Sequence, residues 1–204
     1  MPRQRQKKPS PKRPATGSIR IISGLWRGRK LPVLDAQGLR PTTDRVKETL
    51  FNWIAMSIPH ARCLDLFAGS GSLGFEAASR QAAHVTLLEL DQNTYRQLQS
   101  NRQQVNAENM TIHHQDALSF LRQSPTKHDI VFIDPPFRQD LLNQTIQLLD
   151  HHWLNDRALV YIETEKELDL TEIPAYWQLE KEKFAGQVAY RLYQVHLDPQ
   201  SDSE

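Results

Sequence analysis

The chain has 204 residues, a length that suits one domain with at most a small appendage. Hydrophobic residues make up 39% of it, the mean hydropathy is −0.59, and no apolar run approaches the ~20 residues that span a bilayer. The basic start lacks the apolar segment of a secretory signal, and the single cysteine, Cys63, excludes an internal disulfide framework and a cysteine-based zinc site. We therefore expect a cytoplasmic protein that does not contact a membrane.

Charge is distributed unevenly along the chain. Residues 1–30 contain ten Lys and Arg residues and no acid, so with a net charge of +1 the remaining chain sums to −9. A basic arm on an acidic body is typical of a protein whose partner is rich in phosphate, and a solubilising tail is the alternative. Prolines and the near absence of apolar residues predict disorder for residues 1–17, and a second short tail is expected at 199–204.

Residues 18–58 are expected to form a basic N-terminal extension. Ile19 and Ile21 begin a strand-like pattern that resumes at 30–33 after a turn with two glycines, which predicts a small hairpin. A helix is expected after Pro41–Asp44, which supplies a threonine cap and an acid for the first turn. The apolar face of this helix follows helical spacing and consists of Val46, Leu50, Trp53 and Ile54.

Residues 59–198 alternate short apolar runs with helical stretches. Strands are expected at 63–67, 85–89, 111–114, 130–133 and 158–163, and helices at 73–79, 93–105, 117–122 and 141–149. This alternation predicts right-handed crossovers and a parallel sheet that helices cover on both faces. Two further strands, 178–183 and 188–196, are joined too closely for a helix and predict an antiparallel hairpin at the sheet edge. We therefore expect a doubly wound, seven-stranded α/β core.

A glycine-rich turn follows the first of these strands. Gly69, Gly71 and Gly74 have the spacing that lets a backbone turn tightly, approach a ligand and pack a helix closely on a strand. Glu89 follows Gly69 by 20 residues, where an acid that binds a ribose belongs. An adenosine-containing cofactor is therefore predicted, with a tight turn that binds no ligand as the alternative. Asp91 is expected to be exposed, so Glu89 is preferred as the ribose ligand.

NAD and S-adenosylmethionine both contain adenosine and suit such a turn, and the charges of their other groups distinguish them. The pyrophosphate of NAD favours a bare helix N-terminus, whereas S-adenosylmethionine carries an ammonium group that a carboxylate beside the turn would bind. Asp65 supplies this carboxylate, and Asp116 with Ala117 is placed to bond an adenine edge, although Asp116 is also a candidate helix cap. We expect S-adenosylmethionine, bound by Asp65, Phe67, Ala68, Gly69, Gly71, Glu89, Leu90, Asp116 and Ala117.

The sequence Asp134-Pro135-Pro136-Phe137 follows the fourth strand, at the edge where open α/β sheets bind ligands. Two prolines fix an extended turn, which presents the Asp134 carboxylate and the Pro135 carbonyl as neighbouring acceptors. A planar exocyclic amine is a poor nucleophile, and two acceptors on its N–H groups favour a pyramidal nitrogen that can attack a methyl sulfonium. Phe137 offers a ring for stacking an extruded base. We expect Asp134, Pro135 and Phe137 to be catalytic; the alternative is a capping aspartate before a stiff loop.

These motifs resemble those of a known family. The stretch 134–137 resembles motif IV of methyltransferases that modify exocyclic amines, and Leu64–Gly71 resembles their motif I. More narrowly, the chain from about Ile19 to Leu197 resembles the RsmD family of bacterial 16S ribosomal RNA guanine-N2 methyltransferases, in the stretches 20–31, 39–48 and 186–190. The resemblance implies a Rossmann-like methyltransferase fold and transfer of a methyl group to the N2 amine of a guanine in the small subunit or its assembly intermediate. We expect the protein to act as a monomer.

The resemblance also implies that the basic extension faces RNA. The residues expected to bind RNA are Arg20, Trp26, Arg27, Arg29, Lys30, Arg40 and Arg45. For Trp26, packing of the hairpin onto the body is the alternative.

Two other functions share part of this pattern. A DNA adenine-N6 methyltransferase shares the Asp-Pro-Pro-aromatic motif, but it needs a target-recognition domain for which 204 residues leave little room. A non-catalytic RNA-binding ribosome assembly factor would not need Asp65, Glu89 and Asp134, which are all present. No metal is expected, because adjacent histidines such as His113–His114 point to opposite faces of a strand.

Overall fold

The computed structural model describes residues 16–34, 44–136, 141–149, 152–168 and 170–197. The N-terminal hairpin consists of β1 (Thr16–Arg20) and β2 (Lys30–Leu34), which pair antiparallel as expected. The hairpin begins at Thr16, two residues before the expected boundary at residue 18. The other residues of the two expected tails, 1–15 and 199–204, lie outside the described residues. Helix α1 (Asp44–Trp53) follows, and its apolar face is buried apart from the half-exposed Trp53.

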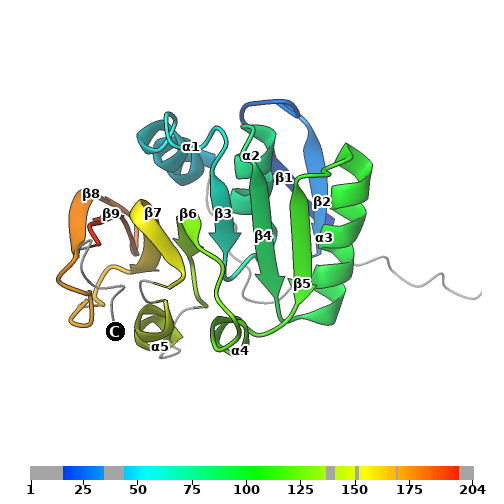
Figure 1. Cartoon of the computed structure of the whole chain (residues 1–204). Helices are drawn as coiled ribbons and strands as arrows, with labels where there is room; N and C mark the ends of the chain where they lie inside the picture. The colour runs from blue at the N-terminus through cyan, green and yellow to red at the C-terminus, as the bar shows by residue number, and fades with distance from the viewer. Residues whose placement is uncertain (1–15, 35–43, 137–140, 150–151, 169, 198–204) are drawn as a thin grey trace, which may run out of the picture.

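Seven strands form the main sheet, in the order β5-β4-β3-β6-β7-β9-β8. Their bounds are β3 (Arg62–Asp65), β4 (His84–Glu89), β5 (Met110–His114), β6 (His128–Ile133), β7 (Leu154–Glu165), β8 (Trp177–Ala185) and β9 (Val188–Val195). The first five of these are parallel, and β9 pairs antiparallel with both β7 and β8 at the edge seen at the left of Figure 1. The predicted doubly wound α/β fold with a C-terminal antiparallel hairpin is confirmed.

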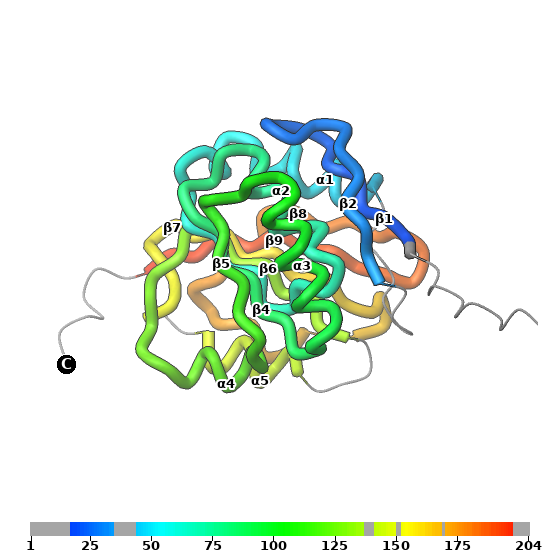
Figure 2. The backbone as a smooth tube through the Cα atoms, turned by 90° about the vertical axis from the view of Figure 1, so that its right-hand side faces the viewer, coloured from blue at the N-terminus to red at the C-terminus, as the bar shows by residue number. Residues whose placement is uncertain are grey.

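Helices cover both faces of this sheet. Their bounds are α2 (Ser72–Ser79), α3 (Gln92–Val105), α4 (Ala117–Leu121) and α5 (Leu141–Leu148). Successive strand residues alternate between two hydrophobic clusters: Cys63 packs in one with the hairpin and α1 to α3, and Leu64 packs in the other with α4 and α5. Figure 1 shows α4 and α5 on the side away from α1 and α2, and Figure 2 shows the hairpin beside α3. Within the described ranges, no helix is long and apolar enough to cross a membrane.

The N-terminal hairpin is bonded to the end of α2. Glu76, with no exposed surface, accepts the backbone N–H groups of Ile22 and Ser23 at 2.7 and 3.0 Å. Arg80 Nε donates to the same carboxylate at 2.8 Å, and Lys47 Nζ lies 4.0 Å from it. These donors offset the free-energy cost of burying the Glu76 carboxylate. Polar contacts as well as packing therefore fix the hairpin to the body.

The order of the strands sets the place of a ligand site. From β3 the chain continues to β4 and β5 on one side, and then crosses to β6 and β7 on the other. Open α/β sheets bind ligands at such a switch point, beside the carboxyl ends of the strands. The glycine-rich turn follows β3 and the Asp-Pro-Pro sequence follows β6, so both flank this point.

Candidate functional site

The glycines of the turn have the conformations and contacts that their spacing predicts. Gly69 and Gly71 have positive φ angles of 50° and 76°, a region that glycine enters without strain. A Cβ on Gly74 would lie 2.7 Å from Leu87 Cδ1, so only glycine lets α2 pack this closely on β4. The turn therefore places its backbone at the carboxyl end of β3 in a fixed shape.

Glu89, at the end of β4, faces this turn. Its Oε2 accepts the N–H of Gly69 at 2.9 Å and its Oε1 accepts the N–H of Asp91 at 2.7 Å. Partial burial raises the pKa of Glu89, and the hydrogen bonds from Asp91 and Gly69 act in the opposite direction. Asp91 is exposed, as expected, and its side chain caps α3 by accepting the N–H of Thr94 at 2.7 Å. Of the two acids, Glu89 is the one bonded to the glycine-rich turn.

Asp65 lies beneath the turn, at the end of β3. Only 2% of its surface is exposed, and its Oδ2 accepts the N–H of Gly74 at 3.2 Å. Burial raises the pKa of Asp65 to about 7, against the lowering effect of hydrogen bonds from Gly74 and Phe67. A buried carboxylate with so strongly perturbed a pKa is a candidate for a functional group.

The third part of the expected cofactor site is the end of β5. Asp116 caps α4, since its Oδ1 accepts the N–H of Ser119 at 2.8 Å. The capping role is thus present, and it is compatible with the expected contact of Asp116 and the buried Ala117 with an adenine. β5 pairs with β4 as far as Glu89, so these residues lie at the same edge as the ribose candidate. Phe67 is half-buried, Ala68 is buried and Leu90 is exposed.

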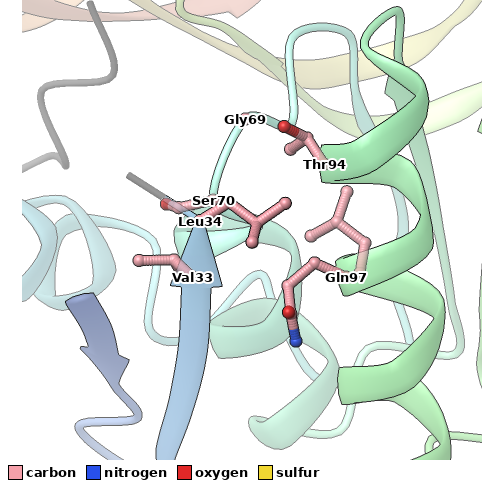
Figure 3. A pocket seen from close by; sticks show the side chains of 7 residues that line it. Val33, Leu34, Gly69, Ser70, Thr94 and Gln97 are labelled. Atoms are coloured by element: carbon pink, nitrogen blue, oxygen red, sulfur yellow. The ribbon is translucent and has the colours of Figure 1, made fainter. Parts of the chain in front are cut away.

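A shallow pocket joins the hairpin to this region. It lies between the end of β2, the glycine-rich turn and α3 (Figure 3). Its lining consists of Val33, Leu34, Gly69, Ser70, Thr94, Gln97 and Leu98. The basic hairpin therefore reaches the turn that is expected to hold the cofactor.

Asp134 stands at the carboxyl end of β6, next to the end of β3. β3 and β6 are paired, and the N–H of Leu66 donates to the carbonyl of Phe132 at 3.1 Å. Asp134 is half-buried and Pro135 is buried. The structure thus brings the Asp-Pro sequence and the glycine-rich turn to neighbouring strand ends, whereas Phe137 lies outside the described residues.

A buried polar pair that the sequence had not pointed to lies beside Asp134. The hydroxyl of Tyr161 donates to Glu163 Oε2 at 2.9 Å, and the two side chains are 0% and 7% exposed. Burial and the nearby charges of Glu163 and Asp134 raise the pKa of Tyr161. The signal in the sequence was an acid at the last position of an expected strand, at the edge where ligands bind.

The structure describes six of the seven expected RNA-binding residues, of which five are exposed and one is buried. Exposed side chains occur at Arg20, Arg27, Arg29, Lys30 and Arg45. Trp26 is only 8% exposed and belongs to the main hydrophobic cluster, which supports the packing alternative. Arg40 lies outside the described residues.

The described residues contain no group of three or more His, Cys, Asp or Glu side chains arranged to hold a metal ion.

Comparison with known proteins agrees with this arrangement. The family model described as Conserved hypothetical protein 95 matches residues 19–194. Ribosomal RNA small subunit methyltransferase D of Escherichia coli (strain K12) is 56% identical over 195 residues, which cover 95% of this chain and 98% of that relative. The chain belongs to the RsmD family.

Two further relatives extend the match. The enzyme of the same name from Haemophilus influenzae is 55% identical over 185 residues, covering 88% of this chain and 95% of the relative. A solved structure of a candidate methyltransferase from Escherichia coli has a TM-score of 0.83 and 55% identity, and the match covers 89% of this chain and all of that one. The RsmD resemblance expected from the motifs is confirmed, and so is the methyltransferase fold.

Proposed function

We propose that the protein transfers a methyl group from S-adenosylmethionine to the exocyclic N2 amine of a guanine in 16S ribosomal RNA. It acts as a monomer on the small subunit or on its assembly intermediate. The observation that carries the proposal is the position of Asp134 and Pro135 beside the glycine-rich turn, at neighbouring strand ends of an RsmD-family chain. The relatives' name, ribosomal RNA small subunit methyltransferase D, supports a small-subunit ribosomal RNA substrate.

The chemistry of the side chains around the turn fits S-adenosylmethionine. Glu89 offers a carboxylate for ribose hydroxyls, Asp65 offers one for the ammonium group, and Asp116–Ala117 offers an acid and a backbone N–H for the adenine. When bound, the cofactor supplies an electrophilic methyl group on a positively charged sulfur. The Asp65 carboxylate beneath the turn disfavours NAD, because the pyrophosphate of NAD is negatively charged.

The Asp134 carboxylate and the Pro135 carbonyl bind the target amine. Accepting both N–H groups orients the nitrogen and opposes its planar, delocalised state, so that its lone pair is directed at the methyl group. No side chain has to form a covalent bond. Burial of Pro135 and partial burial of Asp134 keep water away from these acceptors, which strengthens their hydrogen bonds.

The N-terminal hairpin binds the RNA backbone. Its four exposed cations, Arg20, Arg27, Arg29 and Lys30, lie on one small element, and β2 ends beside the glycine-rich turn. Cations of this kind bind phosphates and set the position of the RNA without selecting its sequence. Arg45, exposed on α1, extends the basic surface.

A methyl-transfer assay tests the proposal. Tritiated S-adenosylmethionine is incubated with the protein and with naked 16S RNA, small subunits, assembly particles or DNA. We expect label in ribosomal RNA only, and N2-methylguanosine after nuclease digestion. Label on adenine N6 in DNA would favour the DNA-modifying alternative. Tight RNA binding without any transfer would favour an assembly factor.

A further inference from the structure

Glu163 lies beside Asp134 at the carboxyl edge of the sheet. The parallel strands β6 and β7 pair in register as far as Ile133 and Ile162. The next residues along the two strands are Asp134 and Glu163. The two carboxylates therefore extend from neighbouring strand ends, one in the expected catalytic motif and one outside it.

The two side chains also lie on the same face of the sheet. Phe132 and Tyr161, two residues earlier on each strand, are paired and contact each other edge to face, with ring centroids 6.4 Å apart. Because residues two apart on a strand share a face, Asp134 follows the direction of Phe132 and Glu163 that of Tyr161. The charge of Asp134 acts on Tyr161, in agreement with this placement.

Two tyrosines lie next to Glu163. Tyr190 on β9 is its direct cross-strand partner, and Tyr190 stacks on Trp53 of α1 with ring centroids 5.5 Å apart. Glu163 is 7% exposed, so its carboxylate needs hydrogen-bond donors to offset the loss of water. The Tyr161 hydroxyl supplies one at 2.9 Å.

We propose that Glu163 selects guanine: its carboxylate accepts the N1–H of the target base while Asp134 and Pro135 hold the neighbouring N2 amine, and Tyr161 orients the carboxylate for this contact. This inference rests on the function proposed above. Asp134 and Pro135 accept N–H groups that any exocyclic amine carries, so they do not distinguish guanine from adenine. The atom next to the amine does, because guanine has an N1–H donor and adenine has an N1 acceptor. A carboxylate facing an acceptor would repel it and lose a hydrogen bond.

Replacing one base in the RNA tests this contact. The target guanosine, located first by product mapping, is replaced by 2-aminopurine riboside through splint ligation, and the RNA is assembled into small-subunit particles. 2-Aminopurine keeps the amine at C2 but presents an N1 lone pair in place of the N1–H. For the wild-type protein we expect kcat/KM on the 2-aminopurine particle to be about 10- to 100-fold lower than on the guanosine particle.

The variant Glu163→Gln should weaken this preference. Tyr161 then donates to the amide oxygen, which leaves the amide N–H₂ to donate to the N1 of 2-aminopurine. We expect a lower rate on guanosine and a higher rate on 2-aminopurine, so the ratio of the two falls at least 10-fold. Glu180→Gln, on the exposed strand β8, makes the same change of charge and should keep the wild-type ratio. Adding Tyr161→Phe to Glu163→Gln should abolish the gain on 2-aminopurine, since the amide is no longer oriented.

A wild-type ratio in Glu163→Gln, or equal rates of the wild type on the two bases, overturns the inference. Calorimetric binding of S-adenosylmethionine shows whether each variant has an intact fold. If Glu163→Gln fails to bind it, Tyr161→Phe alone decides: a ratio that stays at the wild-type value overturns the inference, and a drop of a few-fold or more supports it. If the wild-type product is not N2-methylguanosine, the proposed function itself has failed, which is a different result.

Discussion

Glu89 accepts the backbone N–H of Gly69 at 2.9 Å, so one carboxylate joins the end of β4 to the glycine-rich turn after β3. The residue expected to bind the ribose thus also fixes the loop that surrounds the cofactor. We predict that Glu89→Gln weakens S-adenosylmethionine binding by about 1.5–3 kcal/mol, since it removes a charged acceptor from both the ribose and the turn. Isothermal titration calorimetry measures this loss.

Asp91→Asn is the matched control for this prediction. It removes a negative charge two residues away and keeps an acceptor oxygen for the cap of α3, so the affinity should change less than about two-fold. NAD should give no measurable heat with the wild type. Equal affinities of the two variants would remove Glu89 from the cofactor site, and binding of NAD without binding of S-adenosylmethionine would overturn the assignment of the cofactor.

Asp134→Ala isolates the chemical step. The carboxylate stands at the end of β6 and is not part of the turn that follows β3, so cofactor affinity should stay within about two-fold. Methyl transfer to ribosomal RNA should fall by roughly 10²–10⁴, the range for the loss of one well-placed catalytic group. Single-turnover assays with saturating cofactor measure the rate.

Asp134→Asn is the more conservative control at the same position. Its amide keeps an acceptor oxygen of similar geometry and loses the charge, so it should retain more activity than Asp134→Ala. If Asp134→Ala methylates RNA at a rate near that of the wild type, the aspartate is a structural residue and the catalytic role of the motif is wrong.

Local patterns were sufficient to predict the fold. Apolar strands separated by helical stretches fix a parallel doubly wound sheet, because right-handed crossovers leave few alternatives. Cys63 and Leu64 pack on opposite faces, as the alternation of a covered strand requires. The close packing at Gly74 was also predictable from local sequence. Its spacing after Gly69 is typical of a turn in which the following helix packs closely on a strand, and the strand residue that it contacts is Leu87.

Contacts between distant segments were not predictable. Glu76 had the appearance of an ordinary helix residue, yet it binds the N–H groups of Ile22 and Ser23, more than 50 positions earlier. For Trp26 the sequence left RNA binding and packing of the hairpin on the body open, and the attachment to α2 buries it. Glu163 became a candidate only when the register of β6 and β7 placed it beside Asp134. Such contacts depend on how the strands and helices assemble, and a local sequence pattern does not predict that assembly.

The charges of the hairpin should control the salt dependence of RNA binding. We predict that the double variant Arg27→Gln/Arg29→Gln lowers RNA affinity and makes the slope of log K against log[salt] shallower by up to ~0.7 per lost phosphate contact. Both side chains are exposed, so the stability of the protein should change little. Fluorescence anisotropy with a ribosomal RNA fragment at several salt concentrations measures the slope.

The double variant Arg122→Gln/Arg157→Gln is the matched control. It removes two exposed cations from the end of α4 and from β7, and not from the hairpin. Its slope should equal that of the wild type. The same reduction in both double variants would mean that net charge, and not the hairpin, determines RNA binding.

Asp65 should make the stability of the protein depend on pH. Its pKa is raised to about 7 in the folded protein and stands near 3.8 when the chain is unfolded, so the folded state binds the proton more tightly. Stability contributed by the protonated form is therefore lost as the pH rises from about 4 to 7. Above that range the buried charge costs about 4 kcal/mol.

Asp65→Asn removes this titration while keeping an oxygen that can accept the N–H of Gly74. Its free energy of unfolding, relative to the wild type, should increase from pH 5 to pH 8, and other titrating groups cancel in the difference. Urea unfolding at the two pH values measures it. The same variant should bind S-adenosylmethionine more weakly at pH 8, since the charge that destabilises the free protein is the one that attracts the ammonium group. A pH-independent difference in stability would show that the pKa of Asp65 lies outside this range, and S-adenosylmethionine binding by Asp65→Asn as tight as that of the wild type at pH 8 would remove Asp65 as the partner of the ammonium group.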